Sequence, residues 1–173
     1  MTEFDLYCDT QFWKPLMTSI IFAPWAIGGV VLGWCADRFG RKRVMFISLF
    51  MELLCMVCSI AAYHPWGILL CRIVIGFFLP GAMIQQYIMG VEFSPAKRRN
   101  LFVNGLAIGW CFCGAIQALM AYYITTWKNL ILVQSVPFVI LLPMYYFVPE
   151  SLRYYNTHGR TDDAMWELKR IAR

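Results

Sequence analysis

The sequence predicts an all-α membrane protein with five transmembrane helices. The chain is 60% hydrophobic and only 14% charged, whereas about a quarter of the residues of a soluble domain are charged. Its apolar runs are close to the roughly 20 residues that one helix needs to cross a bilayer. The charged residues gather between these runs. The five predicted spans cover residues 16–36, 44–63, 68–91, 101–124 and 130–148. Residues 1–148 thus form a bundle in the lipid bilayer, and residues 149–173 form a cytoplasmic segment.

Basic residues alternate between the two ends of the spans. The turn at residues 38–43 holds four of them, residues 97–99 hold three, and the segment 149–173 holds five, whereas the other connections hold only Lys14 and Lys128. Because Lys and Arg mark cytoplasmic loops, we expect an extracellular N-terminus and a cytoplasmic C-terminus. This topology accounts for the net charge of +5. No nucleic-acid partner is expected, since no basic region carries interleaved aromatic residues or a groove-reading helix.

The first span leads into a dense charged turn. Five charges lie between Asp37 and Arg43, so this segment is predicted to be a loop at the membrane surface. Gly33 is expected to permit close helix packing, and Gly40 is expected to permit a tight turn. Asp37 lies beside three arginines and could form a charged latch with them.

Two charges lie inside the following spans. Glu52 is the only charged residue of the second span, and we leave open whether it serves a polar pathway or partner, or is a neutral, hydrogen-bonded carboxyl. Arg72 lies about one turn into the third span, where an ion pair or backbone anchor is favoured over contact with a substrate. Gln86 and Tyr87 place polar groups deep in the same span. Such groups usually face a bundle interior or a water-filled cavity.

The remaining features favour packing and topology over enzyme chemistry. Six of the seven cysteines lie in or beside apolar runs, where a thiol behaves as a small hydrophobe, so neither a metal site nor a cofactor is predicted. His64 and His158 are expected on opposite sides of the membrane, so no enzyme site is predicted. An apolar stripe from Ala164 to Ala172 predicts an amphipathic helix in the C-terminal segment.

Three charged segments resemble loops of the major facilitator superfamily. Residues 33–43 resemble the loop between its second and third helices, residues 92–99 the loop after the fourth, and residues 149–153 the segment after the sixth. Residues 2–16 are similar to the end of the large extracellular loop of the organic cation and anion transporters, solute carrier family 22. The resemblance implies that the chain is an incomplete N-terminal half, helices two to six, of a twelve-helix carrier.

The resemblance also implies roles for particular residues. Tyr87 matches an aromatic position facing the substrate cavity, Met83 stands where organic cation transporters often carry tryptophan, and Gln86 is either their neighbour in the cavity or a helix-packing amide. The implied cytoplasmic gate consists of Gly33, Asp37, Arg38, Gly40, Arg41, Lys42, Glu92, Arg98, Arg99, Glu150 and Arg153.

The implied function is transport of small organic ions by alternating access at the plasma membrane. The missing C-terminal half is the expected partner, and this chain is not expected to transport alone. Two alternatives remain open at this stage. One is a truncated, non-transporting membrane protein that associates with full-length carriers, and the other is a carrier of the sugar-porter type.

Overall fold

The computed structural model describes residues 13–62 and 64–151, which form helices and no strand. Five helical segments are long and apolar enough to cross a membrane. Their bounds are α1 Trp13–Ser19 with α2 Phe22–Phe39, α3 Arg41–Ala61, α4 Pro65–Phe93, α5 Arg99–Tyr123, and α6 Trp127–Leu141 with the 3-10 helix η4 Leu142–Tyr146. The predicted all-α membrane fold is therefore confirmed. The predicted amphipathic helix at residues 164–172 lies outside the described residues.

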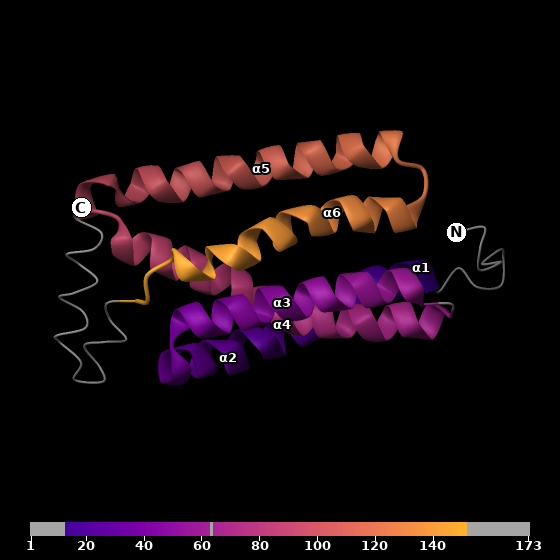
Figure 1. The fold of residues 1–173 in the computed structure, drawn as a ribbon, viewed down its shortest axis with the longest axis horizontal. Coiled ribbons are helices and arrows are strands. Elements are labelled where there is room, and N and C mark those ends of the chain that lie inside the picture. The colour runs from indigo at the N-terminus through magenta and orange to yellow at the C-terminus, as the bar shows by residue number, and fades with distance from the viewer. Residues whose placement is uncertain (1–12, 63, 152–173) are drawn as a thin grey trace.

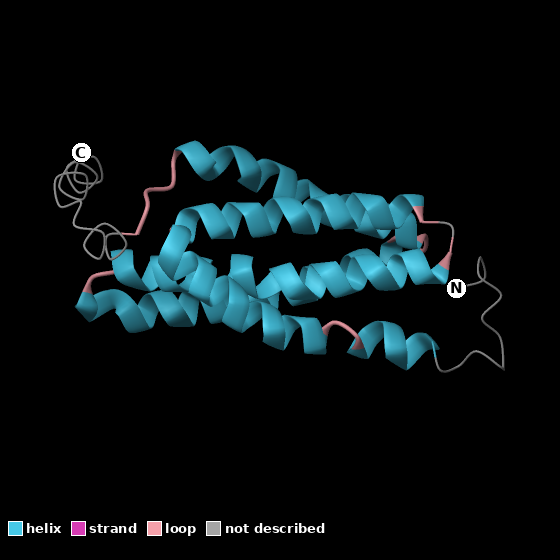
Figure 2. Cartoon of the chain, turned by 90° about the horizontal axis from the view of Figure 1, so that it is seen from below, coloured by secondary structure: helices cyan, strands magenta, loops and turns pink. Residues whose placement is uncertain are grey.

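The helices run along one common axis (Figures 1 and 2). The buried core lies among α2, α3 and α4, where Leu32, Ala36 and Val44 form one cluster and Met45, Phe46 and Met89 form another. Helix α6 and η4 pack on α3, while α5 lies along one edge of the bundle (Figure 1) and contains no buried residue. The bundle therefore has a tight three-helix core and a loosely attached edge.

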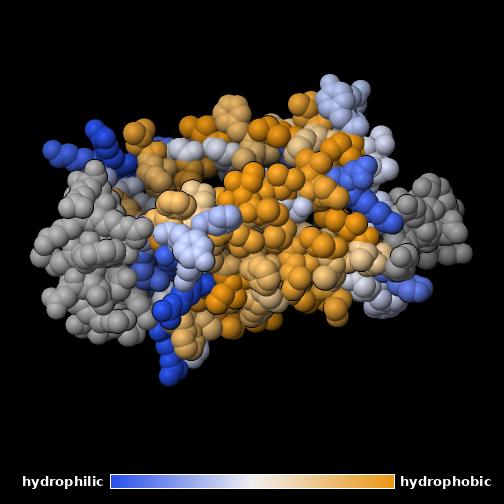
Figure 3. Space-filling model, viewed as in Figure 1, coloured by the Kyte–Doolittle hydropathy of each residue, from blue (hydrophilic) through white to orange (hydrophobic). Residues whose placement is uncertain are grey.

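The surface suits a lipid environment. On the face shown in Figure 3, hydrophobic residues cover the middle of the long axis and hydrophilic residues gather near its two ends. Large apolar side chains are exposed along every spanning segment, among them Val30, Phe50, Leu70, Trp110 and Ile140. Exposed apolar surface of this extent marks contact with lipid or with another protein.

The first span is interrupted, which the sequence prediction did not include. Helix α1 ends at Ser19 and α2 begins at Phe22. Pro24 has no N–H to donate to the carbonyl of Ile20, so the regular hydrogen-bond ladder cannot continue through this point. The Arg72 guanidinium of α4 donates to the Met17 carbonyl across 3.2 Å. This contact attaches the interrupted segment to α4.

The predicted charged loop is shorter than expected. Asp37 and Arg38 belong to the last turn of α2, and Arg41 and Lys42 begin α3, so Gly40 alone separates the two helices. Gly40 has a φ of +105°, a backbone conformation that side chains with a Cβ rarely adopt. The prediction of a loop over residues 37–43 is wrong in extent, because one glycine is enough to reverse the chain direction.

Close helix packing depends on a different glycine from the one expected. A Cβ at Gly28 of α2 would lie 2.0 Å from the Phe77 carbonyl oxygen of α4, whereas a Cβ at Gly33 would meet nothing within 4 Å. The expected close approach at Gly33 is thus not found among the described residues. Small residues let backbones meet in lipid, where dispersion contacts must replace the hydrophobic effect.

Substituting Gly28 should weaken the packing of α2 on α4. The Gly28→Ala substitution forces the Phe77 backbone to move, and overpacking of this kind costs about 1–3 kcal/mol. We expect a lower unfolding midpoint for the purified chain in detergent. Gly33→Ala is the matched control on the same helix and should leave the midpoint unchanged, so equal effects of the two substitutions would contradict this packing.

Candidate functional site

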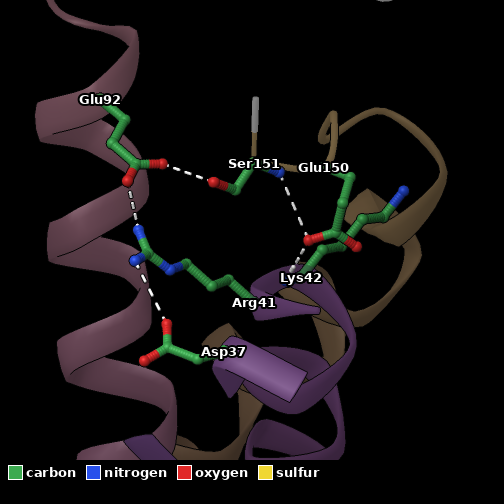
Figure 4. Close-up of polar contacts among 6 residues, drawn as sticks. All are labelled: Asp37, Arg41, Lys42, Glu92, Glu150 and Ser151. Atoms are coloured by element: carbon green, nitrogen blue, oxygen red, sulfur yellow. Dashed lines mark hydrogen bonds and ion pairs between the residues drawn. The ribbon is translucent and has the colours of Figure 1, made fainter. Parts of the chain in front are cut away.

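A network of charged and polar groups joins four segments at one end of the bundle (Figure 4). Arg41, at the start of α3, is buried and extends toward α4. Its Nη1 donates to Glu92 Oε1 in the last turn of α4, and its Nη2 lies 3.4 Å from Asp37 Oδ1 on α2. The guanidinium suits this position because it presents several donors in one plane. One cation thereby links the ends of three helices.

Glu150 takes the place of a local cap for α3. The residue before α3 is Gly40, which has no side chain to accept from the free N–H groups of the first turn. Instead, Glu150 Oε1 accepts from the Lys42 N–H at 2.9 Å, although the two residues are 108 positions apart. A carboxylate at a helix N-terminus is favoured by both the free N–H groups and the helix dipole. The segment after η4 is thereby fixed to the start of α3.

The fit around Gly40 is close. A Cβ at Gly40 would lie 3.1 Å from Glu150 Oε2. Glycine is therefore required here both for its positive φ and for the room that it leaves for the carboxylate. Lys42 also contacts η4 itself, because its Nζ lies 4.4 Å from the centroid of the Tyr145 ring, a geometry that favours a cation over an aromatic face.

Ser151 completes the network and was not among the predicted gate residues. It is fully buried, and its hydroxyl donates to Glu92 Oε2 at 2.5 Å while its N–H donates to Glu150 Oε1 at 3.3 Å. It therefore links the two carboxylates. Its place directly after Glu150, inside a motif already recognised, was the sequence signal that could have identified it.

The other predicted gate residues lie outside this network within the described residues. The Arg38 guanidinium lies 5.4 Å from the centroid of the Trp34 ring, and Arg98 and Arg99 are exposed at the start of α5. Asp37, in contrast, belongs to the network through its contact with Arg41, although its side chain is 74% exposed. Arg153 lies outside the described residues.

The three predicted binding residues line one groove. Met83, Gln86 and Tyr87 of α4 face a cavity of about 490 Å³ whose other wall is α5. The α5 residues on that wall are Val103, Leu106, Ala107, Trp110 and Cys111, which the sequence reasoning did not select. Their spacing of i, i+3, i+4, i+7 and i+8, which puts them on one face of a helix, was the signal available for them. The groove is apolar apart from the amide of Gln86 and the hydroxyl of Tyr87.

Three buried polar side chains lie on facing surfaces of α3 and α4. Ser48, Glu52 and Gln85 are at most 2% exposed, and one oxygen of each has no hydrogen-bond partner among the described residues. An unpaired buried polar group is costly in an apolar environment. A role of Glu52 in a polar pathway and a neutral, hydrogen-bonded carboxyl both remain predictions.

Arg72 donates to a backbone carbonyl of the first span and does not line the groove.

Solved structures define the class of fold. The chain superposes on the xylose transporter XylE from E. coli in a partially occluded inward-open conformation with a TM-score of 0.75 at 20% identity, covering 90% of this chain and 43% of that one. It matches the proton:xylose symporter XylE bound to 6-bromo-6-deoxy-D-glucose equally well, covering 39% of that chain. The helices are therefore arranged as in a major facilitator superfamily transporter.

The chain belongs to the family described as "Sugar (and other) transporter", whose profile matches residues 5–173. It is 33% identical to solute carrier family 22 member 12 of Rattus norvegicus and 33% identical to organic anion transporter 3 of Homo sapiens. It is 32% identical to organic cation transporter 1 of Caenorhabditis elegans. The chain spans 30 to 32% of the length of these relatives. Their similarity confirms the recognised superfamily and a multi-pass membrane protein.

Removing the carboxylate partner of Arg41 should destabilise the bundle. Glu92→Gln leaves a buried guanidinium without its opposite charge, and breaking such a pair costs about 3 kcal/mol. We expect a clearly lower unfolding midpoint in detergent. Asp37→Asn is the matched control, because it removes the exposed carboxylate of the same arginine and should cost less than about 1 kcal/mol. Equal losses would show that Glu92 is not the principal partner.

Proposed function

We propose that this chain forms part of a secondary carrier for small organic ions that works by alternating access in the plasma membrane. The observation that carries the proposal is the network of Asp37, Arg41, Glu92, Glu150 and Ser151, which connects α2, α3, α4 and the segment after η4 at one end of the bundle. Alternating access needs groups of helices that move as rigid units. Buried, mutually satisfied polar groups supply that rigidity.

The network leaves one charge available to a partner. Asp37 is held in place by Arg41, yet most of its carboxylate is exposed. A second half of the carrier could therefore bind it at this end through a basic residue or a helix N-terminus. The contact between Asp37 and the second half would break when the gate opens and form when it closes. The ion pair of Arg41 and Glu92 would persist in both states. A C-terminal half of the carrier is the proposed partner, and we propose that residues 1–173 do not transport without it.

The groove between α4 and α5 is the proposed substrate surface. Its volume of about 490 Å³ lies within the range of roughly 300–1,000 Å³ typical of small-molecule sites. Tyr87 is 45% exposed and presents an aromatic face there, which can bind either an apolar body or an organic cation. Gln86 offers both a donor and an acceptor. These groups favour a small, partly apolar organic ion, as the names of the relatives also suggest.

Two alternatives keep some support. The absence of buried residues on α5 favours a membrane protein that associates with full-length carriers through this helix. The match to XylE and to the sugar transporter profile favours a sugar porter. We rank the organic ion carrier first because relatives of that kind match nearly the whole chain at about 33% identity.

Transport by the full-length carrier that contains this chain should depend on Tyr87. Cells expressing it should show saturable uptake of labelled organic cations or anions, and Tyr87→Ala should raise KM about fivefold, as expected for losing ~1 kcal/mol of aromatic contact. Tyr122→Ala is the control, because Tyr122 is exposed on α5 and does not line the groove. Saturable uptake of hexoses alone would instead support the sugar porter.

The proposed orientation places the connection between α5 and α6 outside the cell. A glycosylation acceptor segment inserted between Thr126 and Trp127 should be modified in cells, because acceptors are used on the lumenal or extracellular side. The same segment inserted between Pro95 and Ala96 should remain unmodified. A gain in mass that endoglycosidase removes would report the modification. The reverse pattern would invert the proposed topology.

A further inference from the structure

A second cavity lies next to the gate network and shares only Gln86 with the proposed substrate groove. Its volume is about 320 Å³, and it lies between α3, α4 and η4. Its lining is apolar except for the amide of Gln86. Prominent lining residues are Met45, Leu49, Met89, Phe93, Phe102 and Met144. Unbranched methionine side chains adapt to irregular, flexible guests, so the cavity suits a hydrocarbon chain better than a rigid polar molecule.

One edge of this cavity is formed by the start of α5. Phe102 is the α5 residue of the lining, and a Cβ at Gly90 would lie 2.1 Å from its Cζ, so the ring rests directly on α4. Arg98 and Arg99 lie one turn before Phe102. Lys97, Arg98 and Arg99, here called the basic triad, are all exposed. The ion pairs recorded among the described residues involve none of the three.

We propose that the cavity and the basic triad together bind one anionic phospholipid. An acyl chain would enter the cavity beside Phe102, and the phosphate would lie against the triad. Charge complementarity carries the choice of ligand, because three exposed cations stand at the end of a spanning helix, where lipid headgroups lie. Basic pockets beside membrane helices bind anionic headgroups in this way. The proposal rests on the proposed orientation, which puts the triad at the anionic cytoplasmic leaflet.

A lipid bound there would touch the supports of the gate. Met89 and Phe93 of the cavity lie on either side of Glu92 along α4. Val148 and Pro149, also in the lining, directly precede Glu150. A bound acyl chain would therefore fill the space behind both carboxylates of the network. Membrane composition would in this way regulate the gate, a role distinct from recognising the transported ion.

Photolabelling tests this site without requiring transport. The purified chain would be placed in nanodiscs with phosphatidylglycerol carrying a photoactivatable group on its acyl chain, and labelled peptides would be mapped by mass spectrometry. We expect labels on cavity segments around Met89, Phe102 and Met144. Phosphatidylglycerol should label them at least about tenfold more than phosphatidylcholine, since each basic side chain near an anionic surface adds roughly fivefold.

Two variants separate the headgroup from the acyl chain. Arg98→Gln with Arg99→Gln should lower this labelling at least about tenfold, whereas Arg38→Gln with Arg43→Gln removes two exposed charges nearby and should leave it unchanged. Met144→Trp should narrow the cavity and reduce labelling by both lipids. Met144 is 45% exposed, so this change should leave the fold intact.

Several outcomes would overturn the proposal. These are equal labelling by the two lipids, labels spread evenly over all apolar faces, and equal effects of the two arginine pairs. Loss of labelling on adding inorganic phosphate would show that the basic triad binds a free anion instead of a lipid headgroup. Because nanodiscs present the same lipids on both faces, the result does not depend on orientation or transport. Failure of the proposed carrier function would therefore be distinguishable from failure of this site.

Discussion

The burial of Arg41 is the constraint on which the rest of this end of the molecule depends. A guanidinium placed beside hydrocarbon must have carboxylates within reach, since an unpaired buried charge is strongly destabilising. Glu92 meets this need from α4, and Ser151 then ties Glu92 to Glu150, which caps α3. The ends of the helices are thereby placed relative to one another. Arg41 thus holds together the helix ends that form the gate and border the neighbouring cavity.

The bundle has a closely packed part, formed by α2, α3 and α4, and a loosely attached helix, α5. In the tight core, glycines such as Gly28 and Gly81 let α4 approach α2 and α3 closely, so packing is dense. At the edge, Phe102 of α5 rests on Gly90 of α4, whereas other α5 side chains line the groove or face outward. Both cavities border this loosely attached helix. Ligand sites in helix bundles commonly lie between helices, and both cavities lie between α5 and its neighbours.

The fold class followed from composition and from the lengths of the apolar runs, because the bilayer fixes how long a spanning helix must be. Local breaks were harder to foresee. Pro24 was visible in the sequence, but the contact of Arg72 with the Met17 carbonyl beside the interruption comes from another helix and could not be read from the sequence. Gly33 was expected to pack closely and Gly28 does so, because which glycine faces a neighbour depends on helix rotation. Motifs located Glu92 and Glu150, whereas the linking role of Ser151 needed three-dimensional proximity.

The Arg41 network acts as one unit, and a double-mutant cycle tests this coupling directly. Glu92 and Glu150 lie on different segments and are joined through Ser151. Glu92→Gln and Glu150→Gln would be made singly and together, and the free energy of unfolding measured in detergent. If the network acts as one unit, the coupling energy between the two sites should be about 1 kcal/mol or more. Losses that add to within about 0.3 kcal/mol would show independent contacts and contradict it.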